Sequence, residues 1–241
     1  MNPIDRRDFG AVALGAAAAT LLHDRDAEAQ PRRPDAGAPL SPSPAVAAIA
    51  PLPFASASLP GLSERMLVSH HDNNYGGAVR KLNEIRTQLG SADPVQSGAY
   101  WSLYGSLKAA ELAARNSAVL HELYFANLAP GQQPSAALAT MVTQRFGSLD
   151  RLRAQLLGAA KAANGWVVLV ADGTTRTLEI VQTENHAMGG WSATPLLVLD
   201  VYEHAYAIDY GANKSGYFDA FWRNVGWSAV HERATRALAR G

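Results

Sequence analysis

The chain has 241 residues, with 21 basic and 21 acidic side chains and no cysteine. Because the charges balance, there is no sign of the basic surface that nucleic-acid binding requires, and we expect no nucleic-acid partner. The lack of cysteine excludes disulfides and thiolate metal sites, so any metal must be held by nitrogen and oxygen ligands. The length suits one domain or two small ones with a substantial core.

Residues 1–29 have the composition of an export signal. Arg6 and Arg7 precede the apolar stretch FGAVALGAAAATLL, and the small residues of AEA lie at the usual cleavage spacing before Gln30. The apolar stretch is shorter than the roughly twenty residues of a membrane span, so we expect no stable membrane insertion. The arginine pair, with Phe9 two positions later, resembles a twin-arginine signal; a chance pair before an ordinary signal peptide is the alternative. Both versions predict an exported, periplasmic protein.

Residues 30–53 hold seven of the thirteen prolines and many alanines. No hydrophobic periodicity is present there, which predicts a disordered or extended linker. Two domains are expected after it: a helical N-terminal domain at residues 54–130 and a C-terminal α/β domain at residues 131–241.

The first half of the mature chain has helical periodicity. A helix is expected from about Leu62 to Leu89, with Ser63 as its N-cap and Gly90 as a stop signal. The stretch VQSGAYWSLYGSLKAAELAARNSAVLHELYFANL predicts one long helix or two joined ones. Two shorter helices, SAALATMVTQRFGS and LDRLRAQLLGAAKAA, are expected to be separated by Gly147.

The periodicity then changes to that of strands. The segments GWVVLVAD and TRTLEIVQT flank DGTT and predict a β-hairpin, and ATPLLVLD predicts a third strand. Further helical segments follow to the C-terminus. This order predicts an α+β fold, in which an N-terminal helical hairpin domain precedes a mixed domain with a three-stranded antiparallel sheet and helices.

Six histidines lie outside the predicted signal. His70 lies on the apolar stripe of the first helix, while His71 is rotated by about 100°, so only one of the two can point inward with Met66. His121 lies in the apolar context SAVLHELYFANL, where a buried imidazole needs a hydrogen-bond partner or a metal. His231 lies in a charged tail and is expected on the surface.

Asp200 and His204 form the second part of a candidate metal site. The apolar strand would deliver Asp200 at its carboxyl end, and a helical segment after it would project both side chains to one side. Three imidazoles and one carboxylate suit iron, manganese or zinc. The spacing alone also leaves open a non-haem iron oxygenase, which needs only two histidines and one carboxylate.

Several separated segments resemble the iron/manganese superoxide dismutase family. The stretch TPLLVLDVYEHAYAIDY is similar to the family's Asp-x-Trp-Glu-His-Ala-Tyr-Tyr signature, which follows an apolar strand. VLHELYFANLAP is similar to its Asn-His-x-x-x-Trp segment. PLPFASASLPGLSERMLVSHH, RFGSLDRLRAQLLGAAKAANGWVVLV and GYFDAFWRNVGW match its amino-terminal, central and carboxyl-terminal segments in the same order. The resemblance extends from about Leu52 to Trp227.

The resemblance implies one manganese or iron ion per subunit, with superoxide as the substrate. The implied metal ligands are His70, His121, Asp200 and His204, with solvent as the fifth. His186 matches a position where many members carry a Gln or His that hydrogen-bonds this solvent, and Trp166 matches an aromatic wall of the site. Glu203 matches a residue that, in the family's dimers, reaches the ligand histidine of the other subunit, which implies a homodimer.

The departures from the family pattern concern the approach to the metal. The usual histidine and tyrosine, four and eight residues after the first ligand, are here Asn74 and Ala78, and the last tyrosine of the signature is Ala207. In the family these three positions form the polar gateway for substrate and protons. Tyr202 replaces the tryptophan of the signature. The implied gateway is therefore altered, while the implied ligand set is complete.

The sequence thus predicts an exported superoxide dismutase of the iron/manganese type, with an altered gateway and reduced activity. Ser117 stands where iron-type members carry glutamine, and together with His186 it indicates a manganese-type or metal-tolerant site. The alternative is a catalytically weak or silent protein of the same fold that binds a metal or a partner. Another mononuclear metal chemistry, such as that of an oxygenase or peroxidase, also stays open.

Overall fold

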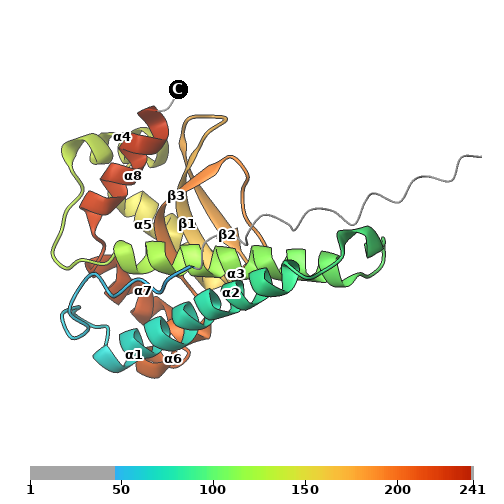
Figure 1. Cartoon of the computed structure of the whole chain (residues 1–241). Helices are drawn as coiled ribbons and strands as arrows, with labels where there is room; N and C mark the ends of the chain where they lie inside the picture. The colour runs from blue at the N-terminus through green and yellow to red at the C-terminus, as the bar shows by residue number, and fades with distance from the viewer. Residues whose placement is uncertain (1–46, 240–241) are drawn as a thin grey trace, which may run out of the picture. The chain divides into compact units, whose positions relative to one another are not determined.

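The structure is a computed structural model that describes residues 47–239. The predicted export signal and residues 30–46 of the predicted linker lie outside the described residues. Within the described part, a helical half is followed by three strands and further helices, which confirms the α+β fold class (Figure 1). The division into domains near residue 130 stays a prediction. No helix among residues 47–239 is long and apolar enough to cross a membrane.

The helix expected at residues 62–89 begins and ends as predicted but contains a π-helical turn. Ser63 caps α1 (Glu64–Ser69), because its hydroxyl accepts a hydrogen bond from the backbone N–H of Met66 at 3.1 Å. The π-helix η1 (His70–Tyr75) follows directly, and α2 (Gly76–Leu89) continues to Gly90. Such wide turns occur frequently at functional sites. A regular apolar spacing does not indicate them, so the sequence did not predict this one.

The long apolar stretch after it forms one helix, which was one of the two predicted alternatives. A short 3₁₀ turn, η2 (Pro94–Gln96), precedes α3 (Leu103–Ala126). The hydroxyl of Ser102 accepts the Gly105 N–H at 3.0 Å and so caps the first turn of α3. Helices α2 and α3 lie side by side along much of their length (Figure 1).

Two shorter helices lead to the sheet, as predicted. They are α4 (Ala136–Phe146) and α5 (Leu149–Ala162). Gly147 ends α4 with φ 87°, a backbone conformation that favours glycine. The hydroxyl of Ser148 then accepts the Arg151 N–H at 3.1 Å and begins α5.

The predicted three-stranded antiparallel sheet is confirmed. Its strands β1 (Trp166–Asp172), β2 (Leu178–Thr183) and β3 (Ala193–Asp200) are arranged in the order β2-β1-β3. Trp166 on the central strand lies opposite Asp200 on β3. The side chain of Asn127 joins the end of α3 to β3, because it accepts the Val198 N–H at 2.8 Å and donates to the Val198 carbonyl at 3.3 Å. The helix that carries His121 is thereby tied to the strand that carries Asp200.

Four helical segments complete the chain: η3 (Glu203–Ala205), α6 (Ala207–Tyr210), α7 (Lys214–Arg223) and α8 (Trp227–Ala239). One large apolar cluster joins these segments to the sheet and to the N-terminal helices. Helix α8 packs against β3. His231 on this helix is half-buried, so its predicted place on the surface was wrong.

Candidate metal centre

The first residue of the π-helix, His70, is fully buried. Its Nε2 lies 3.1 Å from Oδ2 of Asp200. Burial lowers the pKa of His70, because a charged imidazole is costly away from water. His70 therefore presents a neutral ring whose Nε2 points to the carboxylate.

His121 lies on α3 with only 1% of its surface exposed. Its Nδ1–H donates to the backbone carbonyl of Ser117, one turn earlier, at 2.7 Å. This contact assigns the proton of the neutral ring to Nδ1 and leaves a lone pair on Nε2. Burial lowers the pKa of His121 to about 3, so Nε2 stays unprotonated near neutral pH.

The Nε2 atom of His121 tests whether a metal fits. It lies 3.4 Å from Oδ2 of Asp200 and has no hydrogen-bond partner within residues 47–239. A nitrogen lone pair and a carboxylate oxygen repel each other at this distance unless a cation lies between them. The contact thus fits a bound metal ion and does not fit an ordinary hydrogen-bonded pair.

Asp200 is the last residue of β3 and is fully buried. Burial by itself would raise the pKa of its carboxyl group, but hydrogen bonds from His204 and His70 outweigh this effect and hold the pKa well below its usual range. Its Oδ1 accepts the Tyr202 N–H at 2.9 Å, which orients the group. The carboxylate is consequently ionised and fixed in direction.

His204 lies in the 3₁₀ turn η3, and its Nε2 is 3.2 Å from Oδ2 of Asp200. The two residues meet although Asp200 is in a strand and only the chain after it is helical. The expected helical spacing was therefore not the reason for their contact. The turn after β3 folds His204 back over the strand end.

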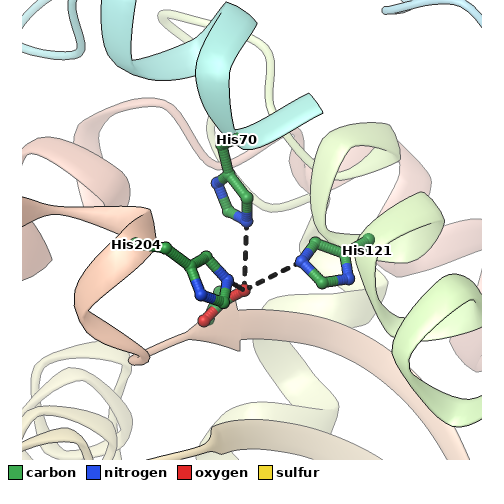
Figure 2. A group of neighbouring side chains, drawn as sticks. His70, His121 and His204 are labelled. Atoms are coloured by element: carbon green, nitrogen blue, oxygen red, sulfur yellow. Dashed lines mark hydrogen bonds and ion pairs between the residues drawn. The ribbon is translucent and has the colours of Figure 1, made fainter. Parts of the chain in front are cut away.

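Figure 2 shows the three imidazoles approaching one carboxylate oxygen from three sides, each from a different element. The ligand atoms of all four residues lie within 4.8 Å of one another, and the group could hold a metal ion. Atoms that share one ion at bond lengths of about 2 Å lie roughly 3–4 Å apart. Nitrogen and carboxylate donors in this arrangement suit iron, manganese or zinc.

His186 and Trp166 lie at the edge of this cluster. The indole N–H of Trp166 donates to Nδ1 of His186 at 3.0 Å, and its ring is perpendicular to that of His121 at 5.0 Å. Since Nδ1 accepts, the neutral His186 carries its proton on Nε2. Burial lowers the pKa of His186, which favours this neutral form. His186 can therefore donate a hydrogen bond from Nε2.

The sequence noted Tyr202 only as a replacement, but the structure places it against the cluster. Its ring lies parallel to that of His204, with centroids 5.3 Å apart, and 4.7 Å from that of His186. Its position between Asp200 and His204 in the chain was the available signal. Tyr202 thus contributes an aromatic surface beside two histidines of the site.

Other predicted residues lie outside the cluster. Asn74 and Ala78 are half-buried on the first helical segment, whereas Ala207 and Glu203 are exposed after β3. The side-chain hydroxyl of Ser117 lies 3.4 Å from Nδ1 of His121, farther than the backbone carbonyl of the same residue. Ser117 therefore acts on the cluster through its backbone.

His71 is also buried, so the expectation that only one of the two adjacent histidines points inward was wrong. Its Nε2–H donates to the carbonyl of Ala50 at 2.8 Å, and Nδ1 lies 2.7 Å from Asp72. The segment before α1 covers it, which the helical period of α1 alone could not show. His71 belongs to this contact and not to the cluster.

Comparisons with known proteins agree with the site. The family description "Iron/manganese superoxide dismutases, C-terminal domain" matches residues 134–233. An iron superoxide dismutase of Cupriavidus metallidurans is 40% identical over 191 residues, which cover 78% of this chain and 96% of that protein. A manganese superoxide dismutase of Halobacterium salinarum is 37% identical over 195 residues, covering 79% and 96%. An iron superoxide dismutase of Aquifex aeolicus is 36% identical over 187 residues, covering 75% and 88%. The chain therefore belongs to the iron/manganese superoxide dismutase family.

Proposed function

We propose that the protein is a superoxide dismutase and that His70, His121, Asp200 and His204 hold its single iron or manganese ion. The observation that carries the proposal is the convergence of four donor atoms within 4.8 Å, in a chain whose relatives are named as such enzymes. Both an iron and a manganese relative are similar to it, so the choice between the two metals is left to measurement.

When bound, the metal ion supplies the one-electron chemistry, since one superoxide is oxidised to dioxygen and the next is reduced to peroxide. Three neutral imidazoles and one carboxylate leave a divalent or trivalent ion with net positive charge, which attracts an anionic substrate. The low pKa values of His70, His121 and Asp200 keep this ligand set free of competing protons near neutral pH. The chain thus supplies charge, geometry and dryness.

His186 is the proposed hydrogen-bond donor to water at the site. Trp166 holds its Nδ1 as an acceptor, so Nε2–H is the free donor. Hydrogen bonds just outside the ligand set typically change metal affinity or activity by 10–100-fold. His186 is accordingly the residue we expect to tune the centre.

The approach to the site is proposed to differ from the family pattern. Asn74, Ala78 and Ala207 supply none of the imidazole and phenol groups that the family pattern has at these positions. Peroxide formation consumes two protons, and positioned side chains usually help to deliver them. We therefore expect slower turnover with water in place of the missing side chains.

The test combines metal analysis with a superoxide-consumption assay on the purified full chain. We expect about one iron or manganese per chain and an activity above that of the same amount of free metal. His204→Ala should remove the metal while the far-ultraviolet circular dichroism spectrum stays unchanged. A fully loaded protein with no activity above free metal would favour the catalytically silent alternative and contradict the proposal.

We also propose export to the periplasm through the segment at residues 1–29, and a homodimer with Glu203 at its interface. The first proposal rests on the arginine pair and the apolar stretch of the sequence. The second is supported by the exposure of Glu203 directly beside His204.

A further inference from the structure

The loop between β2 and β3, residues 184–192, carries His186 and has little packing of its own. Met188 and Trp191 in this loop are 45% and 97% exposed, and Gly189 and Gly190 add no side chains. Segments with few buried apolar contacts open easily, so hydrogen bonds decide where such a loop lies. The position of His186 therefore depends on the few bonds that tie it to the rest of the molecule.

We infer that Asn116 on α3 is a positioning residue for His186. Its side-chain Nδ2 donates to the backbone carbonyl of His186 at 2.8 Å, across 70 residues of sequence. Trp166 binds the same histidine at its ring nitrogen. His186 is thereby held at both ends, at its main chain by Asn116 and at its imidazole by Trp166.

The place of Asn116 on α3 gives this bond its importance. The next residue, Ser117, holds the imidazole of His121 through its backbone carbonyl. One turn of α3 thus determines both where His121 points and where the main chain of His186 lies. A shift of the loop away from Asn116 would change the distance between these two histidines.

Packing does not replace the bond if it is lost. Asn116 lines a pocket of about 190 Å³ between α3 and the sheet, and a second of about 240 Å³ beside Trp191. Both pockets are also lined by Gly189 and Gly190 of the loop. The loop therefore has room to move on either side of Asn116, and the hydrogen bond is what restrains it.

The inference rests on the proposed function, because it concerns the residue that is proposed to tune the centre. The test variant is Asn116→Asp, which keeps the size of the side chain but cannot donate to a carbonyl. Asn83→Asp is the matched control: Asn83 donates in the same way to the Ala47 carbonyl at 2.9 Å, on α2. Both variants add one negative charge on a partly buried helix face.

Two measurements are made on each purified full-length protein. The first is amide hydrogen exchange of residues 184–192. The second is the visible absorption spectrum of the metal-loaded protein with its dissociation constant for azide, an anion that probes the loaded centre. We expect Asn116→Asp to speed the exchange and to change the azide constant about fivefold, as the loss of one hydrogen bond allows. Asn83→Asp should change neither.

A double-mutant cycle shows whether the effect passes through His186. In a His186→Ala background, Asn116→Asp should leave the spectrum and the azide constant unchanged. The same change in both backgrounds, or unchanged loop exchange in Asn116→Asp alone, overturns the inference. Inactive but metal-loaded protein that follows the expected cycle rejects the proposed function only. If no metal binds, the proposed function fails, and the exchange rates still decide whether Asn116 holds the loop.

Discussion

At the scale of single residues, the contact between His121 and Asp200 determines what the site can bind. The Nδ1–H of His121 is committed to Ser117, so its Nε2 faces the carboxylate oxygen at 3.4 Å with a lone pair. A bound cation turns this repulsion into two favourable bonds. The same pair would be an unexplained cost in a protein with no metal.

Replacing Asp200 by asparagine should remove the metal. The amide has the size of the carboxylate but no charge, and a neutral oxygen compensates a metal cation poorly. We expect the metal content after dialysis to fall to less than about a tenth of that of the wild type, measured by plasma mass spectrometry, because losses even outside the ligand set reach 10–100-fold. Asp219→Asn is the control, since Asp219 pairs with Arg153 at the surface. Full metal retention in Asp200→Asn would show that the carboxylate is not a ligand.

At the scale of elements, the π-helix η1 joins the site to the segment that precedes α1. Its last residue, Tyr75, donates to Glu122 at 2.8 Å and accepts the Ala50 N–H at 2.8 Å. Burial raises the pKa of Tyr75 to about 12, so the phenol remains a donor at neutral pH. Glu122 directly follows His121 in α3, so this bond connects the neighbourhoods of two candidate ligands.

The variant Tyr75→Phe should loosen the π-helix and speed metal loss. It removes both hydrogen bonds of the phenol, and we expect a decrease of about 1–3 kcal/mol in the free energy of unfolding. Chelator competition should show faster metal release, because His70 begins the same π-helix. Tyr210→Phe, which deletes a phenol bonded to the Gly61 carbonyl, should leave the release rate unchanged. Equal release rates in all three proteins would separate the π-helix from metal retention.

The β1–β2 hairpin should contribute a pH-dependent part of the stability through Asp172. Its carboxylate accepts hydrogen bonds from the Thr175 N–H, the Ser192 hydroxyl and the Thr174 N–H, which hold the pKa of Asp172 below its usual range. The folded pKa is depressed, so this stabilisation is present above the unfolded pKa of about 4 and is lost as the pH falls through the folded pKa. Asp172→Asn should therefore destabilise the protein at pH 7, by an amount that shrinks below about pH 4. Denaturant unfolding across this pH range checks it; a difference that stays constant with pH contradicts it.

At the scale of the whole molecule, Glu203 is the proposed link between subunits. It is exposed on η3, beside His204, whose side chain is 26% exposed. Glu203→Ala should weaken the proposed homodimer at least about tenfold, because removing one partner of a buried charged pair costs several kcal/mol. Light scattering after size exclusion, over a range of protein concentrations, measures this. Glu232→Ala on α8 is the exposed control. A wild-type monomer at all concentrations contradicts the proposal.

Export is the second prediction at this scale. Arg6 and Arg7 lie outside the described residues, and a twin-arginine receptor reads the pair itself and not its charge alone. The double substitution Arg6→Lys and Arg7→Lys should leave the protein in the cytoplasm, as measured by cell fractionation with a mature-chain antibody. Undiminished export of the double variant would indicate an ordinary signal peptide.

Much of the fold was predictable because its signals are local. Ser63 and Gly147 mark helix ends through their own hydroxyl and backbone preferences, and the change of apolar period marks the three strands. The π-helix was not predictable, because it keeps the composition of an ordinary helix. The burial of His71 and the partial burial of His231 depend on segments that pack over them from elsewhere in the chain.

The sequence by itself determined the order of helices and strands, the α+β class and the candidate ligands, because propensity, spacing and family resemblance are properties of the chain. Only the tertiary structure decided that His70, His121 and His204 meet at one oxygen of Asp200, with the His121 lone pair turned toward it. It also decided that Trp166 and Asn116 hold His186 from two sides. These contacts join residues far apart in sequence, and their distances and proton positions result from how the elements pack.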